Sequence, residues 1–314
     1  MADFLNSYGF LIIQMALNAL LGLTVYLPMM AGQLSLATPG FYAIGGYVAA
    51  ILATRVWIPA EGAVYGWDAI LAEMAIAAVL CGVLAVIIGY LSLRLRGIYL
   101  ALATIAFIQI VQEAALNIEI TDKAIGIFGI PQPFEGSGTL NYGVIVFPLL
   151  ILTMFFMWRL ERGRVGRAFI ALREDELAGA AMGINPTYYK VLAFVLGAML
   201  AGMVGAVNAH VLNTWNARQG TFDTSILFLA FVIIGGSRTF FGAIVGAVLL
   251  TALPEFLRAV AGLDGLSPAL ANLIRDGRFI VYGLLIAVGT QFFPQGIVSP
   301  DLFKQRKVKE VADA

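Results

Sequence analysis

The sequence predicts an all-α polytopic membrane protein with about nine transmembrane helices, eight to ten being compatible with the same pattern. The chain of 314 residues is 61% hydrophobic and only 12% charged, whereas soluble domains carry roughly 25% charged residues. Apolar runs of about 20 residues, the length that crosses a bilayer, recur along the chain. The loops between them are short, so we expect a single transmembrane domain over residues 1–314.

Each expected span is an apolar run bounded by glycine, proline or charged residues. One long apolar stretch supplies two of the expected spans, residues 222–236 and 240–258, because Gly235, Gly236 and Arg238 divide it. In order, the expected spans are residues 8–30, 40–56, 69–93, 98–117, 142–158, 188–210, 222–236, 240–258 and 277–293.

The distribution of Lys and Arg predicts the orientation, because these residues prefer cytoplasmic loops. If the loop of residues 159–190 is cytoplasmic, about 13 of the 19 basic residues fall on that side. The N-terminus is then outside, and the C-terminal tail, residues 301–314, is cytoplasmic. The N-terminal stretch MADFLNSYGF lacks the basic region of a cleaved signal peptide.

Several classes of chemistry are excluded by what the sequence lacks. There is no Gly-x-x-x-x-Gly-Lys-Ser/Thr motif to cradle ATP phosphates. With one histidine and one cysteine in the chain, we expect no metal cluster and no catalytic Cys–His pair. A net charge of zero gives no support for nucleic-acid binding. We therefore expect no catalytic residue, no metal and no bound cofactor, and a buried structural thiol at Cys81.

The stretch ERGRVGRAFIALREDELAGAAMGIN, residues 161–185, is a polar interruption of an otherwise apolar chain. It predicts a helix of about ten residues, too short to be stable alone in water. Its polar face is acidic, whereas lipid-binding helices usually carry Lys and Arg there, so a protein partner is favoured over the bilayer. The alternative is an ordinary solvated loop helix. The residues assigned to docking are Arg173, Glu174, Asp175, Glu176, Leu177, Met182 and Gly183.

Polar residues inside the spans are candidates for a translocation path. The segment GQLSLATPG, residues 32–40, suits either a re-entrant turn packed in protein or a plain cytoplasmic loop. Gln14 and Asn18 share one helix face, where helix-to-helix hydrogen bonding is the favoured interpretation. A structural role is likewise favoured for His210. The path candidates are Gln33, Ser35, Thr38, Gln109 and Glu113.

Several segments resemble the permeases of branched-chain amino-acid ABC transporters, the Liv type, and within that family the M-like subunit. GRVGRAFIALREDELAGAAMGINPTYYKVLAFVLGAMLAGMVGAV is similar to the coupling loop and the helix that follows it. GQLSLATPGFYAIGGYVAA, LRLRGIYLALATIAFIQIV and VIIGGSRTFFGAIVGAVLLTALPEFLR resemble further family segments. The resemblance covers residues 10–300 in the expected order.

The resemblance implies a permease subunit of an ABC importer for branched-chain or related small amino acids in the inner (cytoplasmic) membrane. Its partners would be a second related permease, two ATPase subunits carrying ATP and Mg, and an extracytoplasmic solute-binding protein. The predicted cytoplasmic helix, Arg173 to Gly183, would be the coupling helix that sits in an ATPase groove.

Departures from the family pattern leave the solute open. Gln109 and Gln112 stand where the family often has Glu and Arg, and Asp122 and Lys123 replace glycines of the outer loop. Urea, short amides or another small solute are therefore alternatives. A stand-alone channel or secondary transporter would instead predict inverted repeats and acidic residues at mid-membrane, and clear mid-span acids are lacking.

Overall fold

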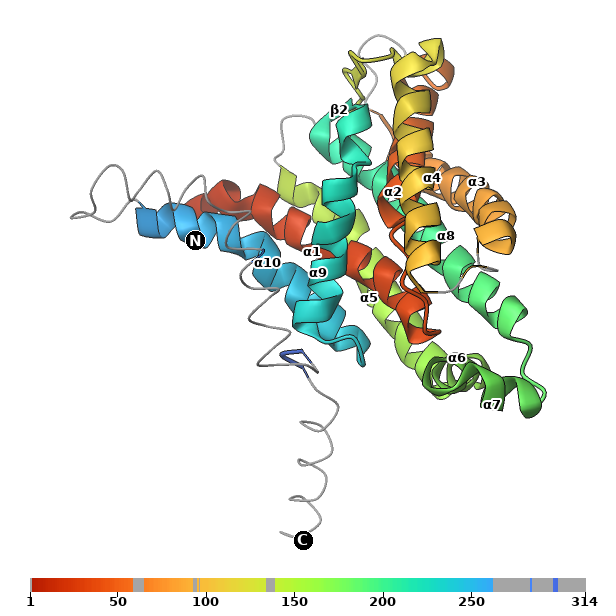
Figure 1. The fold of residues 1–314 in the computed structure, drawn as a ribbon. Helices are drawn as coiled ribbons and strands as arrows, with labels where there is room; N and C mark the ends of the chain where they lie inside the picture. The colour runs from red at the N-terminus through yellow and green to blue at the C-terminus, as the bar shows by residue number, and fades with distance from the viewer. Residues whose placement is uncertain are drawn as a thin grey trace, which may run out of the picture.

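The computed structural model describes residues 2–58, 65–92, 95, 97–133, 139–261, 283 and 296–298. These residues form a helical bundle with one short two-stranded ribbon (Figure 1). The expected span 277–293, apart from residue 283, lies outside the described residues, as does the tail 301–314.

Seven described helices are long and apolar enough to cross a membrane. The all-α polytopic class is therefore confirmed, and the expected number of nine is approximate. The expected span 40–56 is the exception, because it forms a shorter α-helix followed by a π-helical turn, Leu52–Val56. The helices are α1 Ala2–Met30, α2 Thr38–Ile51, α3 Trp67–Ser92, α4 Ile98–Asn117, α5 Gly143–Arg162, α6 Arg164–Glu174, α7 Glu176–Ala181, α8 Pro186–Leu212, α9 Phe222–Gly235 and α10 Phe240–Ala261.

Short elements connect these helices. Single turns of 3-10 helix cover Glu119–Thr121, Thr139–Tyr142 and Ala217–Gln219. Strand β1, Ile127–Phe128, pairs antiparallel with β2, Thr214–Trp215. The expected break between the two late spans is confirmed, because α9 ends at Gly235 and α10 begins at Phe240.

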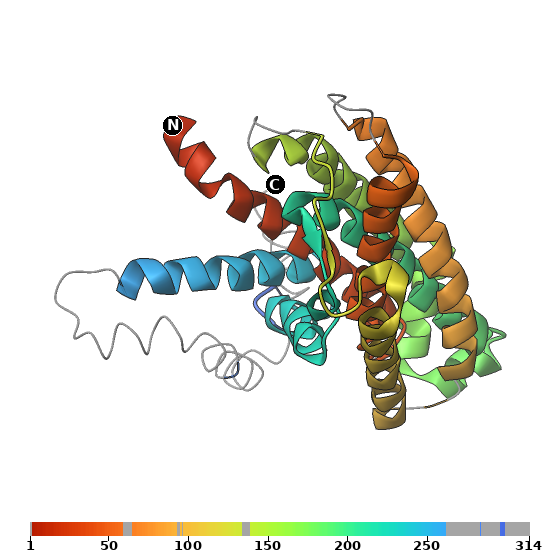
Figure 2. The same ribbon diagram turned by 90° about the horizontal axis from the view of Figure 1, so that it is seen from above.

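Helix α8 is the central packing element, in contact with α1, α2 and α3. Helices α1, α9 and α10 lie together on one side of the bundle, and α3 and α4 lie on the other (Figures 1 and 2). Small residues permit the close crossing of α2 and α8. A Cβ on Gly45 would come within 2.1 Å of the Gly202 carbonyl oxygen, and one on Gly205 within 2.1 Å of the Tyr42 carbonyl oxygen. Cys81 is buried beside this crossing, as expected.

The described connections gather at two ends of the bundle. At the end that carries α6 and α7, which we call the loop end, the Tyr26 hydroxyl donates to Glu161 at 2.7 Å. The opposite end, which we call the ribbon end, carries β1 and β2. There Arg55, after α2, forms an ion pair with Asp122, after α4, at 2.7 Å. The helices between these connections therefore run alternately between the two ends.

A buried polar cluster fixes the ribbon end. The Nε2 atom of His210 lies 2.5 Å from Glu73 Oε2, and both side chains are fully buried. The Tyr65 hydroxyl donates to the other oxygen of Glu73. The Nδ1 atom of His210 lies 2.7 Å from the Pro131 carbonyl oxygen, which can only accept, so Nδ1 carries a proton. This cluster joins α3, α8 and the loop after β1, and it gives His210 the structural surroundings that the sequence favours.

We expect Glu73→Ala to lower the free energy of unfolding by about 3 kcal/mol, because it leaves His210 buried without its partner. The measurement is thermal unfolding of the purified protein in detergent. Glu119→Ala is the control, since Glu119 forms only an exposed pair with Lys123 and should change stability by less than about 0.5 kcal/mol. Equal effects of the two substitutions would contradict a stabilising role for the cluster.

A second expectation concerns the α2–α8 crossing. Gly205→Ala should destabilise the bundle by about 2 kcal/mol or more, because the added methyl group meets rigid backbone. Gly82→Ala should cost less, since its new methyl group meets the flexible side chain of Met199 at 3.0 Å. The same unfolding assay compares the two variants. If the Gly82 variant were as unstable as the Gly205 variant, contact with rigid backbone would not explain the cost of an added methyl group.

Candidate functional site

The polar interruption folds as two short helices rather than the single helix expected from Arg173 to Gly183. Helix α6 ends at Glu174 and α7 begins at Glu176. The break is at Asp175, whose backbone is extended and whose carboxylate accepts hydrogen bonds from Leu177 N at 2.8 Å and Ala178 N at 3.0 Å. Aspartate at such a position caps a new helix, and this local competition overrode the longer helical pattern.

The acidic residues of the loop hold its own structure. Asp175 caps α7, Glu176 forms an ion pair with Lys190 of α8 at 2.8 Å, and Glu174 lies 3.4 Å from Arg173. The acidic stretch that suggested a docking surface is therefore engaged within the chain. The apolar side chains that remain open are Leu177, 74% exposed, and Met182, 82% exposed.

Helix α7 is seated on α6 through a glycine. Gly179 is buried, and a Cβ there would lie 3.1 Å from Leu172 of α6. Gly183 then turns the chain with a φ of +84°, and Ile184 N donates to the Gly179 carbonyl at 3.1 Å. Such a bond commonly closes the end of a helix. The packing holds α7 as a compact projection at the loop end (Figure 1).

The loop also contacts the bundle at the turn between α1 and α2. Gly32 has a φ of +76°, and a Cβ there would lie 3.0 Å from Arg173 Cα. Next to it, the Gln33 side chain is only 3% exposed, and both atoms of its amide lack a hydrogen-bond partner in the part of the chain that the structure describes. Helix α6 therefore lies directly against the turn that leads into α2.

The sequence-predicted path residues fall into two groups. Gln33, Ser35 and Thr38 are buried, and their segment is packed inside the protein. Leu36 N donates to Thr104 Oγ1 of α4 at 3.1 Å, and Ser225 Oγ of α9 donates to the Leu36 carbonyl at 3.2 Å. The other group, Gln109 and Glu113, is exposed on α4. Within this chain the two groups do not form one site.

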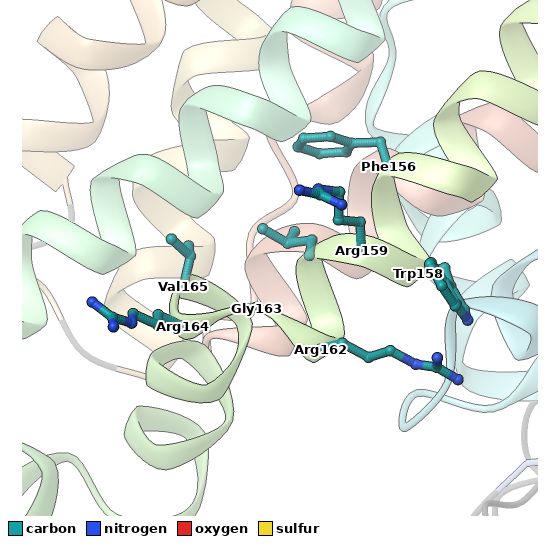
Figure 3. Close-up of a pocket in the computed structure, with 8 residues that line it drawn as sticks. Phe156, Trp158, Arg159, Arg162, Gly163, Arg164 and Val165 are labelled. Atoms are coloured by element: carbon teal, nitrogen blue, oxygen red, sulfur yellow. The ribbon is translucent and has the colours of Figure 1, made fainter.

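Arginines surround a groove of about 540 Å³ where α5 meets α6 (Figure 3). The guanidinium of Arg162 lies 4.1 Å from the centre of the Trp158 ring, a cation–π contact. Figure 3 shows this pair on one side of the groove, with Arg164 and Val165 on the other. Arg159 lines the same groove. The loop end thus joins positive charge to an interfacial aromatic residue, a combination typical of a membrane boundary.

A second hollow, of about 470 Å³, lies between α1, α8, α9 and α10. The amide of Gln14 donates to Asn208 Oδ1 at 3.1 Å, and Asn18 Nδ2 donates to Thr251 Oγ1 at 2.9 Å. Both α1 residues therefore make the helix-to-helix hydrogen bonds that the sequence favours. They also line the hollow, which sequence analysis missed because Asn208 and Thr251 lie far away along the chain.

These features together define a multi-span membrane protein of the permease kind, with a hollow between its helices that is lined partly by polar side chains and an exposed helical projection at one end. Over residues 7–288 the sequence matches the family model described as the branched-chain amino acid transport system permease component. The chain belongs to this family.

Individual relatives agree with this assignment. The high-affinity branched-chain amino acid transport system permease protein LivM of Escherichia coli strain K12 is 32% identical over 280 residues, 79% of this chain and 61% of that protein. BraD of Pseudomonas aeruginosa, named for the same transport system, is 28% identical over 291 residues, 85% of this chain and 86% of its own. The autoinducer 2 import system permease protein LsrC of Escherichia coli O9:H4 is 28% identical over 170 residues, 48% of each chain.

The chain thus spans less than two thirds of the LivM relatives it matches. No solved structure matches. The relatives are membrane permeases and not enzymes, in agreement with the expected absence of a catalytic role.

The contact between α6 and the α1–α2 turn can be tested with Gly32→Ala. We expect this change to cost about 1–2 kcal/mol in unfolding free energy, because alanine is strained at a positive φ and its Cβ meets Arg173. Gly129→Ala is the control, since Gly129 also has a positive φ, +70°, but nothing lies within 4 Å of its Cβ. Thermal unfolding compares the two variants. A larger loss of unfolding free energy in the Gly32 variant than in the Gly129 variant would identify the contact with Arg173 as the cause, whereas equal losses would contradict it.

Proposed function

We propose that this chain is a permease subunit of an ABC importer that moves branched-chain or related small amino acids across the inner membrane. Family membership over most of the chain is the observation that carries the proposal. The sequence has no phosphate-binding loop, so ATP and Mg would be bound by two partner ATPase subunits. An extracytoplasmic binding protein would deliver the solute.

We assign the loop end to the cytoplasm. Arg159, Arg162 and Arg164 surround the groove there, and Arg238 is exposed in the turn between α9 and α10. Basic residues at membrane boundaries favour the cytoplasmic side. The N-terminus is then outside. The ribbon end would face the binding protein.

The α6–α7 projection would couple the ATPases to the bundle. Its exposed Leu177 and Met182 supply the apolar surface that a partner groove would cover. Movement of α7 would pass through α6 and Arg173 to Gly32, and from there to α2. ATP binding would then favour one arrangement of the bundle over another by population shift. The Gln33 amide, which has no hydrogen-bond partner among the described residues, lies at the turn that such a change would rearrange.

A second, related permease would complete the membrane unit. The α4 helix has only 22% of its apolar window buried in this chain, and it carries the exposed Gln109 and Glu113. Polar side chains at membrane depth usually face protein or water rather than lipid. These two residues remain candidates for the path on that basis.

Import of a different small solute is the alternative, and two observations favour it. LsrC, whose name assigns it to autoinducer 2 import, is a relative of this chain. The Asp122 and Lys123 pattern of the outer loop points the same way: Asp122 pairs with Arg55, so this loop differs from a glycine-rich one.

Replacing both Leu177 and Met182 by aspartate tests the coupling role. We expect co-purification with the ATPase subunits and ATP-driven uptake to fall at least tenfold, because charge would enter an apolar contact. Ile125→Asp is a matched control, since Ile125 is also 74% exposed but lies at the ribbon end. It should leave ATPase association unchanged.

Normal association of the double variant would refute α7 as the docking element. Its stability should be close to that of the unmodified chain, since neither side chain is buried. A thermal unfolding measurement on the same samples separates a docking defect from misfolding.

A further inference from the structure

The hollow between α1, α8, α9 and α10 has the size of a small-molecule site. Its volume of about 470 Å³ lies within the range of roughly 300–1,000 Å³ that such sites occupy. It lies toward the ribbon end, because Leu212 at the end of α8 and Gln219 just after β2 both line it. A solute arriving at that end would meet this hollow before the buried turn at Gly32.

The polar groups of the hollow are amides and hydroxyls held in fixed positions. Gln14 donates to Asn208 at 3.1 Å, and Asn208 in turn donates to the Tyr42 hydroxyl. One turn further along α1, Asn18 donates to Thr251 at 2.9 Å, and Thr251 donates to the Ala247 carbonyl at 2.6 Å. Each amide offers both a donor and an acceptor. Such groups can satisfy an ammonium and a carboxylate of one solute.

The described lining contains no charged side chain. Asp223 and Glu255 are neighbours in sequence of lining residues, but neither lines the hollow, and Glu255 is paired with Arg258 at 2.8 Å. A solute with net charge would lose hydration here without gaining a counter-charge. A net-neutral zwitterion also loses hydration, but its two charges offset each other and leave no net charge to be balanced by the lining.

The remaining walls are apolar. Phe228 and Phe231 of α9 face the polar groups across the hollow, together with Leu250 of α10. These side chains suit a short hydrocarbon group. The chemistry of the lining therefore matches an amphipathic solute that has a neutral or zwitterionic head and an aliphatic part.

The hollow is open on one side. Gln14, Asn18 and Thr251 are only partly buried in this chain, although they lie in helices long enough to span the membrane. Facing these groups toward lipid would be costly. Among the described residues nothing covers this side, and we infer that water reaches it, as in an aqueous path.

We propose that this hollow is an intramembrane binding site for small, net-neutral amphipathic solutes, with Asn18, Thr251 and Gln14 as its recognition groups. The inference rests on the proposed importer function, and it narrows the solute class to zwitterionic aliphatic amino acids and neutral analogues. The uncharged lining formed by the described residues disfavours anionic and cationic amino acids, whose net charge would find no counter-charge among them.

The first test is uptake into vesicles by the assembled importer with its binding protein. We expect Thr251→Val to reduce ATP-driven uptake of L-leucine about tenfold, because the Asn18 amide loses its acceptor and the solute a hydroxyl. Thr153→Val is the matched control. Thr153 is a membrane-span threonine that also donates to a carbonyl four residues earlier, at 2.7 Å, but it lies outside this hollow.

The second test asks directly whether water and solute enter. Cys81 is the chain's single cysteine and is buried, so the unmodified protein gives a low background. Thr251→Cys should react with a hydrophilic methanethiosulfonate reagent, whereas Thr153→Cys should not. In the importer with its binding protein, L-leucine should slow the reaction, and L-glutamate and L-lysine should not.

The outcomes separate this inference from the importer function. An unreactive Thr251→Cys, or normal uptake by Thr251→Val, would overturn the binding site while leaving the importer intact. Equal protection by L-glutamate or L-lysine would overturn the solute class. Conversely, protection by L-leucine without ATP-dependent uptake in the unmodified complex would support the site and refute the importer.

Discussion

The close crossing of α2 and α8 is the constraint on which the other features depend. Gly45 meets Gly202, and Gly205 meets the Tyr42 carbonyl, at distances that admit no side chain. Between apolar helices in lipid, burial of apolar surface gives little net driving force, so close packing and hydrogen bonds must hold the helices together. Helix α8 then places Asn208 at the hollow and His210 in the buried cluster of the ribbon end, although the two residues are less than one helical turn apart.

Two ends of the bundle are built in different ways, and the difference suits their proposed roles. At the ribbon end, the fully buried Glu73 and His210 and the strand pairing of Ile127 with Trp215 fix the loop after α4 to the helices. At the loop end, α7 rests on α6 through the small contact of Gly179 with Leu172. The ribbon end is thus fixed by buried polar contacts, whereas the α6–α7 projection is held by a glycine contact and by the ion pair of Glu176 with Lys190.

Polar groups at membrane depth are treated in three distinct ways. The Glu73–His210 pair is enclosed and satisfied internally. Gln14 and Asn18 are hydrogen-bonded and still face a hollow. Gln33 is enclosed but unsatisfied among the described residues. An unsatisfied buried amide is costly, so the Gln33 amide is the least favourably placed of these polar groups among the described residues.

The sequence by itself determined the class of protein, the boundaries of most spans and the division of the late apolar stretch at Gly235. Hydrophobic length and glycine breaks are local signals, and lipid leaves few alternatives to helices. Local reasoning also located the polar interruption, although it missed the break at Asp175, because a capping carboxylate competes with helix periodicity over a few residues.

Only the tertiary structure decided which polar residues act together. Asn18 and Thr251 are bonded across 233 residues of sequence, and Gln14 and Asn208 across 194. No periodicity relates positions so far apart, because their meeting depends on how α1, α8 and α10 pack. The same packing buried Gln33 and left Gln109 exposed, although both are glutamines in or beside membrane spans. The sequence gives the chemistry of each side chain, whereas the burial and the partners of that side chain follow from the packing of the whole bundle.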